Sequence, residues 1–253
     1  MLHHVLWTGG WDSTFRMLQL CRELQPGDVV QPVYVADESR SSTQKEIETM
    51  QEITSLLRDI TTPDTVKDVI VVQKADIPPN PDITRAYQAI REIVSIGKQY
   101  EWLARLATVY PGIEIGIEKP NGEYSGCVSA IEKTGKMIRR DGSFFVDPAA
   151  SSRDCVLLFG NFSFPIIEMT EKEMVDLVKR WNCQFIMQKI WFCHHPIGQT
   201  ACGYCRPCQQ KMECDMEWLL PPAGQKRYKL YKRISKVFGA KLAKISMNLL
   251  YRR

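Results

Sequence analysis

Short apolar runs alternate with stretches of helical periodicity over most of the chain, and this alternation constrains the fold more than any other feature. The runs typical of buried strands span residues 3–8, 29–36, 68–73, 112–118 and 155–159. The stretches with helical spacing of apolar side chains span residues 13–24, 43–57, 84–109 and 170–181. Such alternation predicts an α/β fold, a Rossmann-like parallel sheet with helices on both faces. Residues 121–145 fit neither period.

Local signals refine two of the helices. The helix over 84–109 is expected in two pieces that meet near Gly97. The helix over 170–181 begins with a capping box of Thr170 and Glu173.

Ligands of parallel sheets bind at the carboxyl ends of the strands. The turn after the first strand, residues 8–13, is therefore the predicted active site.

That turn is glycine-rich and reads Thr8-Gly9-Gly10-Trp11-Asp12-Ser13-Thr14. Two glycines allow a tight turn and let a ligand approach the backbone closely. The amides at the start of the next helix favour an anion, and the hydroxyl groups add donors. Asp12 would repel a bare phosphate, so it fits best with Mg²⁺ between them. The alternative is a plain strand-to-helix turn capped by Asp12 and Ser13.

Nine cysteines are a high count, and four of them crowd together at Cys193, Cys202, Cys205 and Cys208. Tight C-x-x-C spacing in a chain without a secretory signal favours a metal over disulfides. Four thiolates suit a closed, structural zinc site, with an iron–sulfur cluster or no metal as alternatives. The neighbouring His194 and His195 are expected to lie outside the ligand set. The remaining cysteines are expected to be small buried hydrophobes, in a reducing compartment.

The turn at residues 8–14 resembles the PP-loop, S-G-G-x-D-S-[ST], with Thr8 in place of the first Ser. It lacks the Lys of the Gly-Lys-Ser/Thr type of phosphate-binding loop. Enzymes with a PP-loop cleave ATP to AMP and pyrophosphate while they adenylate a substrate oxygen. The resemblance implies that Thr8, Gly9, Gly10, Trp11, Asp12, Ser13 and Thr14 bind ATP with Mg²⁺, and that Asp12 and Ser13 act in catalysis.

The loop and the cysteines together resemble the 7-cyano-7-deazaguanine synthase (QueC) family, which joins a PP-loop to a late C-x8-C-G-x-C-x-x-C zinc site. Residues 165–174 are similar to the family's P-L-x-x-[LM]-T-K-x-E-I stretch. Lys98 and Gln99 stand where the family has an Arg-Asn pair, which makes Lys98 the candidate for developing phosphate charge. The alternative for Lys98 is an exposed helix lysine. The resemblance covers roughly residues 3–215.

The chain also departs from the family, which identifies it as a divergent member. Glu171 replaces a lysine, residues 192–195 replace S-C-Y-N, and the Asp and Arg of the family's Y-P-D-C-R are missing from 124–128. The resemblance implies that a carboxylate, 7-carboxy-7-deazaguanine, attacks the α-phosphate of ATP, and that ammonia then displaces AMP to give an amide. A second ATP dehydrates the amide to a nitrile in that family, as in queuosine biosynthesis. One alternative acceptor is a larger amine, such as a protein N-terminus in antiviral defence. A non-enzymatic nucleotide- or nucleic-acid-binding module is the other.

A strong charge asymmetry sets the C-terminus apart. The chain carries 33 Lys and Arg and 29 Asp and Glu; ten of the basic residues and no acidic residue follow Trp218, so the first 217 residues carry 23 − 29 = −6. Apolar side chains at helical spacing, Ile234, Val237, Phe238, Leu242 and Ile245, predict a C-terminal helix with one buried face. We expect this face to dock on the domain or on a second subunit. An acidic protein and nucleic acid are the alternative partners.

The predicted organisation has three parts: a PP-loop ATP pyrophosphatase domain over 1–190, a four-cysteine zinc site over 191–215 and a basic helical tail over 216–253. Hydrophobic content of 44% and charged content of 25% are ordinary for a globular chain. No apolar run is long enough to span a bilayer and no secretory signal is apparent, so we expect a cytoplasmic homodimer without membrane partners.

Overall fold

The computed structural model describes residues 1–37, 43–62, 64–120 and 126–251. These residues form two compact units, Met1–Glu171 and Lys172–Arg253. The regions predicted as a zinc site, 191–215, and as a basic tail, 216–253, both belong to the second unit. The three-part division itself stays a prediction.

The first unit is built on a five-stranded sheet whose strands all run parallel, in the order β3-β2-β1-β4-β7. The strands are β1 Leu2–Leu6, β2 Val29–Ala36, β3 Ile70–Gln73, β4 Ile113–Ile115 and β7 Phe162–Ser163. The central strand β1 pairs on both sides, with Leu6 opposite Val33 of β2 and Ile115 of β4. A parallel sheet is thus confirmed.

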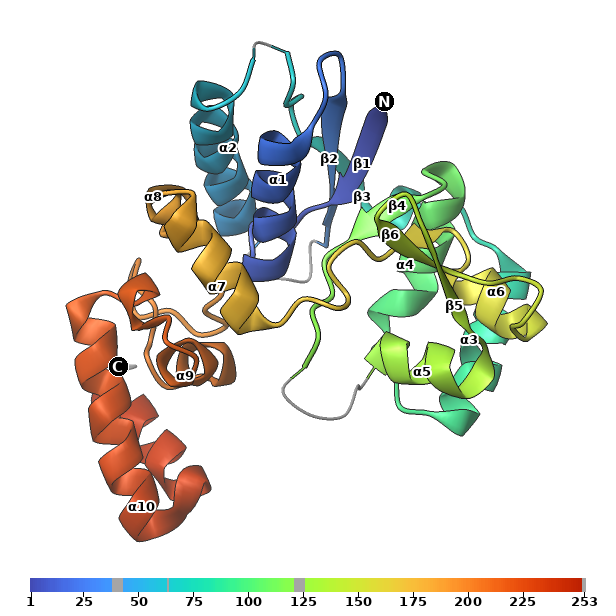
Figure 1. Cartoon of the computed structure of the whole chain (residues 1–253). Coiled ribbons are helices and arrows are strands. Elements are labelled where there is room, and N and C mark those ends of the chain that lie inside the picture. The colour runs from blue at the N-terminus through green and yellow to red at the C-terminus, as the bar shows by residue number, and fades with distance from the viewer. Residues whose placement is uncertain (38–42, 63, 121–125, 252–253) are drawn as a thin grey trace. The chain divides into compact units, whose positions relative to one another are not determined.

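Helices cover both faces of this sheet (Figure 1). On one side lie α1 Trp11–Glu23 and α2 Thr43–Asp59; on the other lie α3 Pro81–Ile93, α4 Gln99–Val109, α5 Gly126–Thr134 and α6 Arg153–Phe159. Strand β2 shows why both faces must be covered. Its Val33 and Val35 join the core formed with α3–α6, while the Tyr34 hydroxyl donates to Glu46 on α2, 2.7 Å away. The predicted α/β fold with helices on both faces is confirmed.

The predicted fifth strand at 155–159 is wrong, because these residues form most of helix α6. Ser152 caps the helix by accepting a hydrogen bond from the Cys155 amide, 3.2 Å away. A run of five apolar residues fits a buried helix turn as well as a buried strand, and periodicity cannot separate the two. The fifth strand is β7, which pairs with β4 through Ile113 and Phe162.

The ambiguous stretch 121–145 contains helix α5 and most of a hairpin of β5 Met137–Arg140 and β6 Ser143–Val146; its first five residues lie outside the described part of the chain. Asp141 and Gly142 form the two-residue turn, with φ of 48° and 78°. An Asp-Gly pair with both φ values positive matches the twist of a tight hairpin. The short antiparallel pair explains why neither a helical nor a parallel-strand pattern fitted.

The second unit contains helices with no strands among its described residues. They are α7 Glu171–Arg180, which begins at the last residue of the first unit, α8 Gln184–Met187, α9 Arg206–Glu213, the 3-10 turn η2 Glu217–Leu219, and α10 Pro222–Tyr251. No helix in the described residues combines the length and apolar content needed to cross a membrane.

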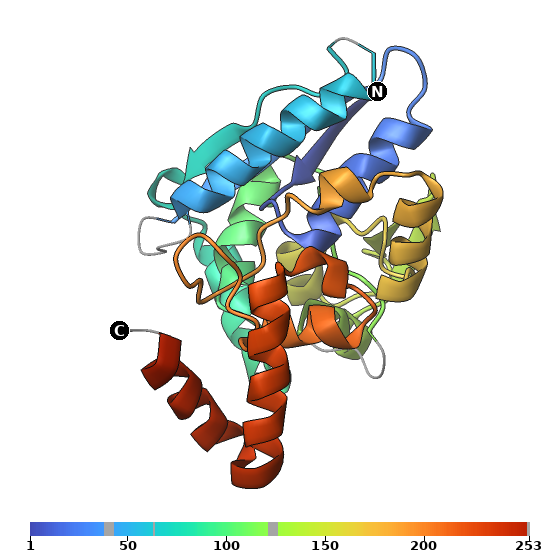
Figure 2. The ribbon, with the colours of Figure 1, turned by 90° about the vertical axis from the view of Figure 1, so that its left-hand side faces the viewer.

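The C-terminal helix differs from the prediction. Helix α10 is interrupted at Gly239, with φ 80° and ψ 158°, so it forms two arms that meet at a turn (Figure 2). The interruption changes the direction of the chain after Phe238, and the predicted apolar face is therefore not buried. Val237, Phe238, Leu242 and Ile245 are between 47% and 72% exposed.

Candidate functional site

The glycine-rich loop follows the central strand at the point where the strand order reverses. From β1 the chain builds β2 and β3 to one side, and then crosses to add β4 and β7 on the other. Open parallel sheets bind ligands in the crevice outside the carboxyl ends of the two strands at such a switch point. Here those strands are β1 and β4, and residues 8–14 follow β1 after Trp7.

The loop presents backbone amides as the start of a helix does. Gly9 has φ 68°, Gly10 is the N-cap without a side-chain cap, and α1 begins at Trp11. The first amides of any helix have no acceptor within the helix, and they carry its positive dipole end. Asp12 lies in this first turn and is half-buried. The Thr8 amide donates to Ser13 Oγ at 3.4 Å, which closes the turn.

Two of the predicted ligand-binding side chains face the interior. Trp11 is 4% exposed, and Thr14 is fully buried with its hydroxyl accepting a hydrogen bond from the Trp7 indole at 2.9 Å. Thr14 therefore anchors Trp7, the residue between β1 and the loop. Thr8 is exposed, whereas Ser13 is buried at 8% exposure. Their roles toward a ligand stay predictions.

Gly116, one residue beyond β4, is a site residue that sequence reasoning missed. A Cβ at this position would lie 2.8 Å from the Ser13 amide nitrogen and 3.0 Å from the Asp12 carbonyl carbon. The backbone after β4 therefore lies against the first turn of α1, and only glycine fits without a shift. The available signal was a single glycine inside the predicted strand 112–118, because glycine within a strand often marks a close backbone approach.

Other polar groups follow the neighbouring strands at the same edge of the sheet. Asp37 comes directly after β2 and accepts from Lys74, which follows β3, at 2.8 Å. The Lys74 ammonium also lies 5.8 Å from the centre of the Trp102 ring on α4. Lys98 is exposed at the N-cap of α4. Its catalytic role stays a prediction.

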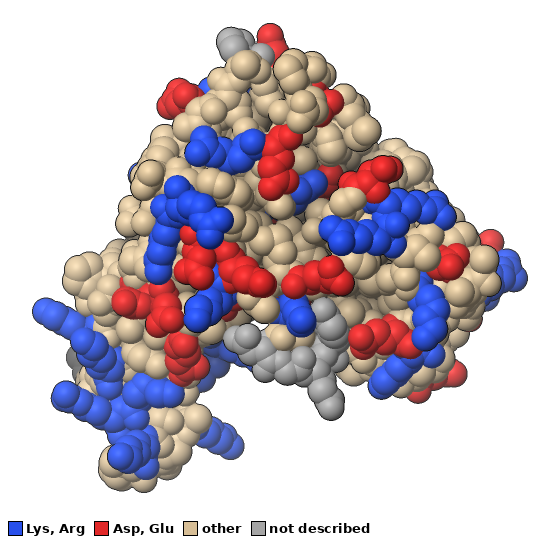
Figure 3. Space-filling view, in the orientation of Figure 1, with Lys and Arg blue, Asp and Glu red and all other residues tan. Residues whose placement is uncertain are grey.

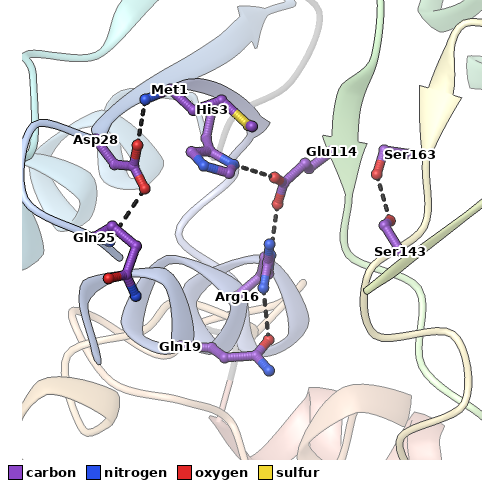
Figure 4. A network of polar contacts seen from close by, with 9 residues as sticks. All are labelled: Met1, His3, Arg16, Gln19, Gln25, Asp28, Glu114, Ser143 and Ser163. Atoms are coloured by element: carbon purple, nitrogen blue, oxygen red, sulfur yellow. Dashed lines mark hydrogen bonds and ion pairs between the residues drawn. The ribbon is translucent and has the colours of Figure 1, made fainter. Parts of the chain in front are cut away.

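A buried carboxylate ties α1 to the sheet behind the loop (Figure 4). Glu114 on β4 is bonded to Nδ1 of His3 at 2.9 Å and accepts from Arg16 of α1, which also donates to Gln19. Burial by itself raises the pKa of Glu114, but the hydrogen bonds from His3 and Arg16 outweigh it and hold the pKa below its ordinary value. The ionised carboxylate thus fixes the helix whose N-terminus carries the loop.

The four predicted metal ligands come together in the second unit. Cys193, Cys202, Cys205 and Cys208 are all buried, and their sulfur atoms lie within 4.8 Å of one another. Cys205 is the N-cap of α9, and Cys208 is in its first turn. Backbone amides also point at the sulfurs: Cys202 N lies 3.2 Å from Cys193 Sγ, and Cys205 N lies 3.2 Å from Cys202 Sγ. This group is able to hold a metal ion. His194 and His195 are not members of it.

The closeness of the four sulfurs controls their protonation. The contact with Cys202 raises the pKa of the Cys193 thiol, and the contact with Cys193 raises that of Cys208. The pKa values of Cys202 and Cys205 are lowered because Cys193 hydrogen-bonds to both. Some of the thiols can therefore lose their protons while the others keep theirs. Four thiolates at this distance need a cation between them.

The start of α10 supports residues 201–205, which we call the cysteine loop. This contact was not predicted from the sequence. Arg227 is buried and donates to the carbonyl oxygens of Ala201 and Cys202, both at 2.8 Å. A Cβ on Gly203 would lie 2.1 Å from the Gly224 carbonyl oxygen, so the loop and the helix touch through backbone atoms. No spacing rule connects Arg227 with the cysteines, because the contact is between segments more than twenty residues apart.

Comparisons with known proteins find similarity among solved structures but not among sequences. No protein-family model matches the chain, and no curated protein sequence matches it. Among solved structures, the chain is similar to the U34-tRNA thiolase NcsA from Methanococcus maripaludis with its 4Fe-4S cluster. The identity is 11%, the match covers 94% of this chain and 73% of that chain, and the TM-score is 0.43.

Proposed function

We propose that this chain is an ATP-using enzyme of the PP-loop class, which cleaves ATP to AMP and pyrophosphate as it adenylates a carboxylate. The observation that carries the proposal is the position of residues 8–14. A PP-loop-like sequence lies at the topological switch point of a parallel sheet, and its helix start is pressed against Gly116. A plain strand-to-helix turn requires no such close backbone approach from a second strand.

The residues of the loop divide into those that bind and those that position. The amides of the first turn of α1 and the Ser13 hydroxyl would bind phosphate oxygens, and Asp12 would hold the Mg²⁺ that accompanies ATP. Thr14, with its hydroxyl on Trp7, positions the loop from the interior. Magnesium would neutralise charge on the phosphates. The protein would supply fixed donors at the place where that charge develops.

For the substrate we propose a deazaguanine acid, 7-carboxy-7-deazaguanine, on the motif resemblance alone. Its carboxylate oxygen forms a bond to the α-phosphorus of ATP, pyrophosphate leaves, and the product is an acyl-adenylate. An amine then bonds to the acyl carbon, AMP leaves, and the amine loses a proton to give an amide. Ammonia is the simplest amine; a larger amine such as a protein N-terminus gives a conjugate by the same steps.

The nucleotide product tests the class of chemistry. With ATP, the carboxylate and ammonium, chromatography is expected to show AMP and no ADP. Mass spectrometry is expected to show the amide, or the nitrile where a second ATP has dehydrated it. Asp12→Ala and Ser13→Ala are expected to abolish AMP formation with a normal melting temperature. Asp68→Asn is the matched control, because the Asp68 side chain is 93% exposed. ADP as the product would overturn the proposal.

We also propose that the four cysteines hold one structural Zn²⁺. A Zn–S bond is about 2.3 Å, which places the sulfurs of a tetrahedral site about 3.8 Å apart. The closest pairs here are 3.9 Å for Cys193–Cys205, 3.9 Å for Cys202–Cys208 and 3.4 Å for Cys205–Cys208. In a four-iron cluster each of the four thiolates binds a different iron, so the sulfurs stand further apart. The donor set and its spacing therefore fit a single ion.

Elemental analysis tests the metal. One zinc per chain is expected in the purified protein, and Cys205→Ser is expected to lose it and to melt at a lower temperature, because zinc binding is coupled to folding. Cys214→Ser is the matched control, a half-buried cysteine outside the group of four. Iron in the folded protein, or a folded protein without metal, would contradict the zinc assignment.

A further inference from the structure

The C-terminal helix folds back on itself as a hairpin with an anchored base. Its first arm is 222–238 and its second arm is 240–251, with the break at Gly239. The base is held by the Tyr204 hydroxyl, which donates to Asn248 at 3.1 Å, and by the stacked rings of Tyr204 and Tyr231, 6.4 Å apart. The Tyr251 ring also lies over the Arg227 guanidinium, at 5.7 Å. These contacts fix the base of both arms to the cysteine loop. None of them involves the turn at Gly239.

The turn and the outer face of the second arm expose large apolar side chains. Of the thirteen large hydrophobic residues that are exposed in the described chain, seven lie between Val237 and Tyr251. The six most exposed in this segment are Val237 at 72%, Leu249 at 70%, Phe238 at 63%, Leu250 at 60%, Leu242 at 53% and Ile245 at 47%. Scattered exposed apolar residues are ordinary, whereas a concentration of this kind marks an interaction surface.

Cations surround these apolar side chains. The exposed basic residues of the hairpin are Lys226, Lys229, Lys232, Arg233, Lys236, Lys241 and Lys244, and Glu217 is the last acidic residue of the chain. Lys236 and Lys241 flank the turn on its two sides. Figure 3 shows the basic side chains of this region gathered around uncharged surface. We define residues 236–242 as the hairpin tip.

We propose that the hairpin tip binds the surface of a bilayer that contains anionic phospholipid, with Val237, Phe238 and Leu242 entering the boundary between headgroups and acyl chains. Both features of the tip favour binding to such a surface, because the surface buries apolar side chains and its anionic lipids attract lysines. A second copy of the chain on this face would bring like charges together. Nucleic acid would satisfy the lysines but gives no gain for burying aliphatic side chains.

Vesicle binding of the full-length, metal-loaded protein tests the proposal. Flotation with vesicles of phosphatidylcholine and phosphatidylglycerol is expected to carry the protein, and vesicles of phosphatidylcholine alone are expected to carry far less. Lys236→Gln, Lys241→Gln and Lys244→Gln together are expected to weaken binding about a hundredfold, at about fivefold per lysine near an anionic surface. The matched control removes three exposed cations elsewhere, by Lys133→Gln, Lys179→Gln and Arg180→Gln.

The apolar arm of the test uses Val237→Ser with Phe238→Ser, and Ile93→Ser with Val109→Ser as the matched pair of exposed apolar residues. The first pair is expected to lose vesicle binding and the second to keep it, while zinc content and AMP formation in solution stay normal for all variants. Unchanged binding of the tip variants would overturn the proposal. So would binding of single-stranded RNA that depends on the same lysines without vesicle binding, or a dimer in sedimentation that the tip variants dissociate.

Discussion

Gly116 sets how closely the backbone after β4 approaches the loop. Gly116→Ala places a methyl group 2.8 Å from the Ser13 amide, so either the loop or β4 must move. We expect a loss of about 1–3 kcal/mol in the free energy of unfolding, typical of overpacking, and a larger loss of ATP affinity. Thermal melts and nucleotide titrations measure the two effects. Gly27→Ala is the control: its φ is 91° but its Cβ meets nothing within 4 Å, so it strains the backbone and should leave ATP affinity unchanged.

The contacts of Glu114 with His3 and Arg16 are expected to stabilise the fold in a way that acid removes. Its folded pKa lies below the ordinary value of 4.5, so the ionised form favours the fold. That contribution is fully present above the ordinary pKa and is lost as the pH falls through the lowered one. We expect Glu114→Gln to melt below the wild type at neutral pH, with the difference shrinking below about pH 4.5. Thermal melts at several pH values measure this difference in melting temperature. A difference that stays constant across this range would show that the charge of Glu114 does not stabilise the fold.

Single residues also show where sequence reasoning ends. The seven loop residues and the four cysteines could be singled out because each set is contiguous or closely spaced in the sequence. Gly116 and Arg227 could not, because each acts on a segment distant along the chain: Gly116 on Ser13, and Arg227 on Cys202. A sequence pattern reports local spacing, whereas these two roles depend on tertiary contacts.

Elements built from regular alternation were predictable, and short or broken elements were not. Strand β2 has the predicted bounds, 29–36, and the helix over 84–109 is two helices that meet near Gly97 as expected. The five-residue run of α6 has no period of its own, so it was assigned to the wrong type. In α10 the apolar spacing continues across Gly239, but the positive φ of that residue turns the second arm away.

The contact between the cysteine loop and α10 predicts that the helix controls metal retention. Arg227→Met leaves the buried carbonyl oxygens of Ala201 and Cys202 without their donor, at a cost of about 1–3 kcal/mol. We expect metal affinity to fall about 10- to 100-fold, as for residues that support metal ligands. Zinc release to a chromophoric chelator measures it. Lys229→Met, an exposed residue on the same arm, is the control, and equal release rates for both variants would contradict the role of Arg227.

At the scale of the whole molecule, the proposed chemistry and the proposed membrane attachment belong to different compact units. The first, 1–171, contains the sheet, the switch point and the loop; the second, 172–253, contains the four cysteines and the basic hairpin. The charge follows the same division: residues 1–171 carry 17 − 24 = −7, and residues 172–253 carry 16 − 5 = +11. We therefore expect changes in the hairpin to alter where the protein binds and not how it cleaves ATP.

The most direct test of the central claim is exchange of labelled pyrophosphate into ATP, with the carboxylate substrate present and the amine omitted. Adenylation is reversible before the amine reacts, so the wild type should form labelled ATP only when the carboxylate is present. Asp12→Ala and Ser13→Ala should show no exchange, and Asp68→Asn should match the wild type. Release of orthophosphate with ADP, or exchange that survives in the Asp12 and Ser13 variants, would contradict the assignment of the loop at residues 8–14 to cleavage at the α-phosphate.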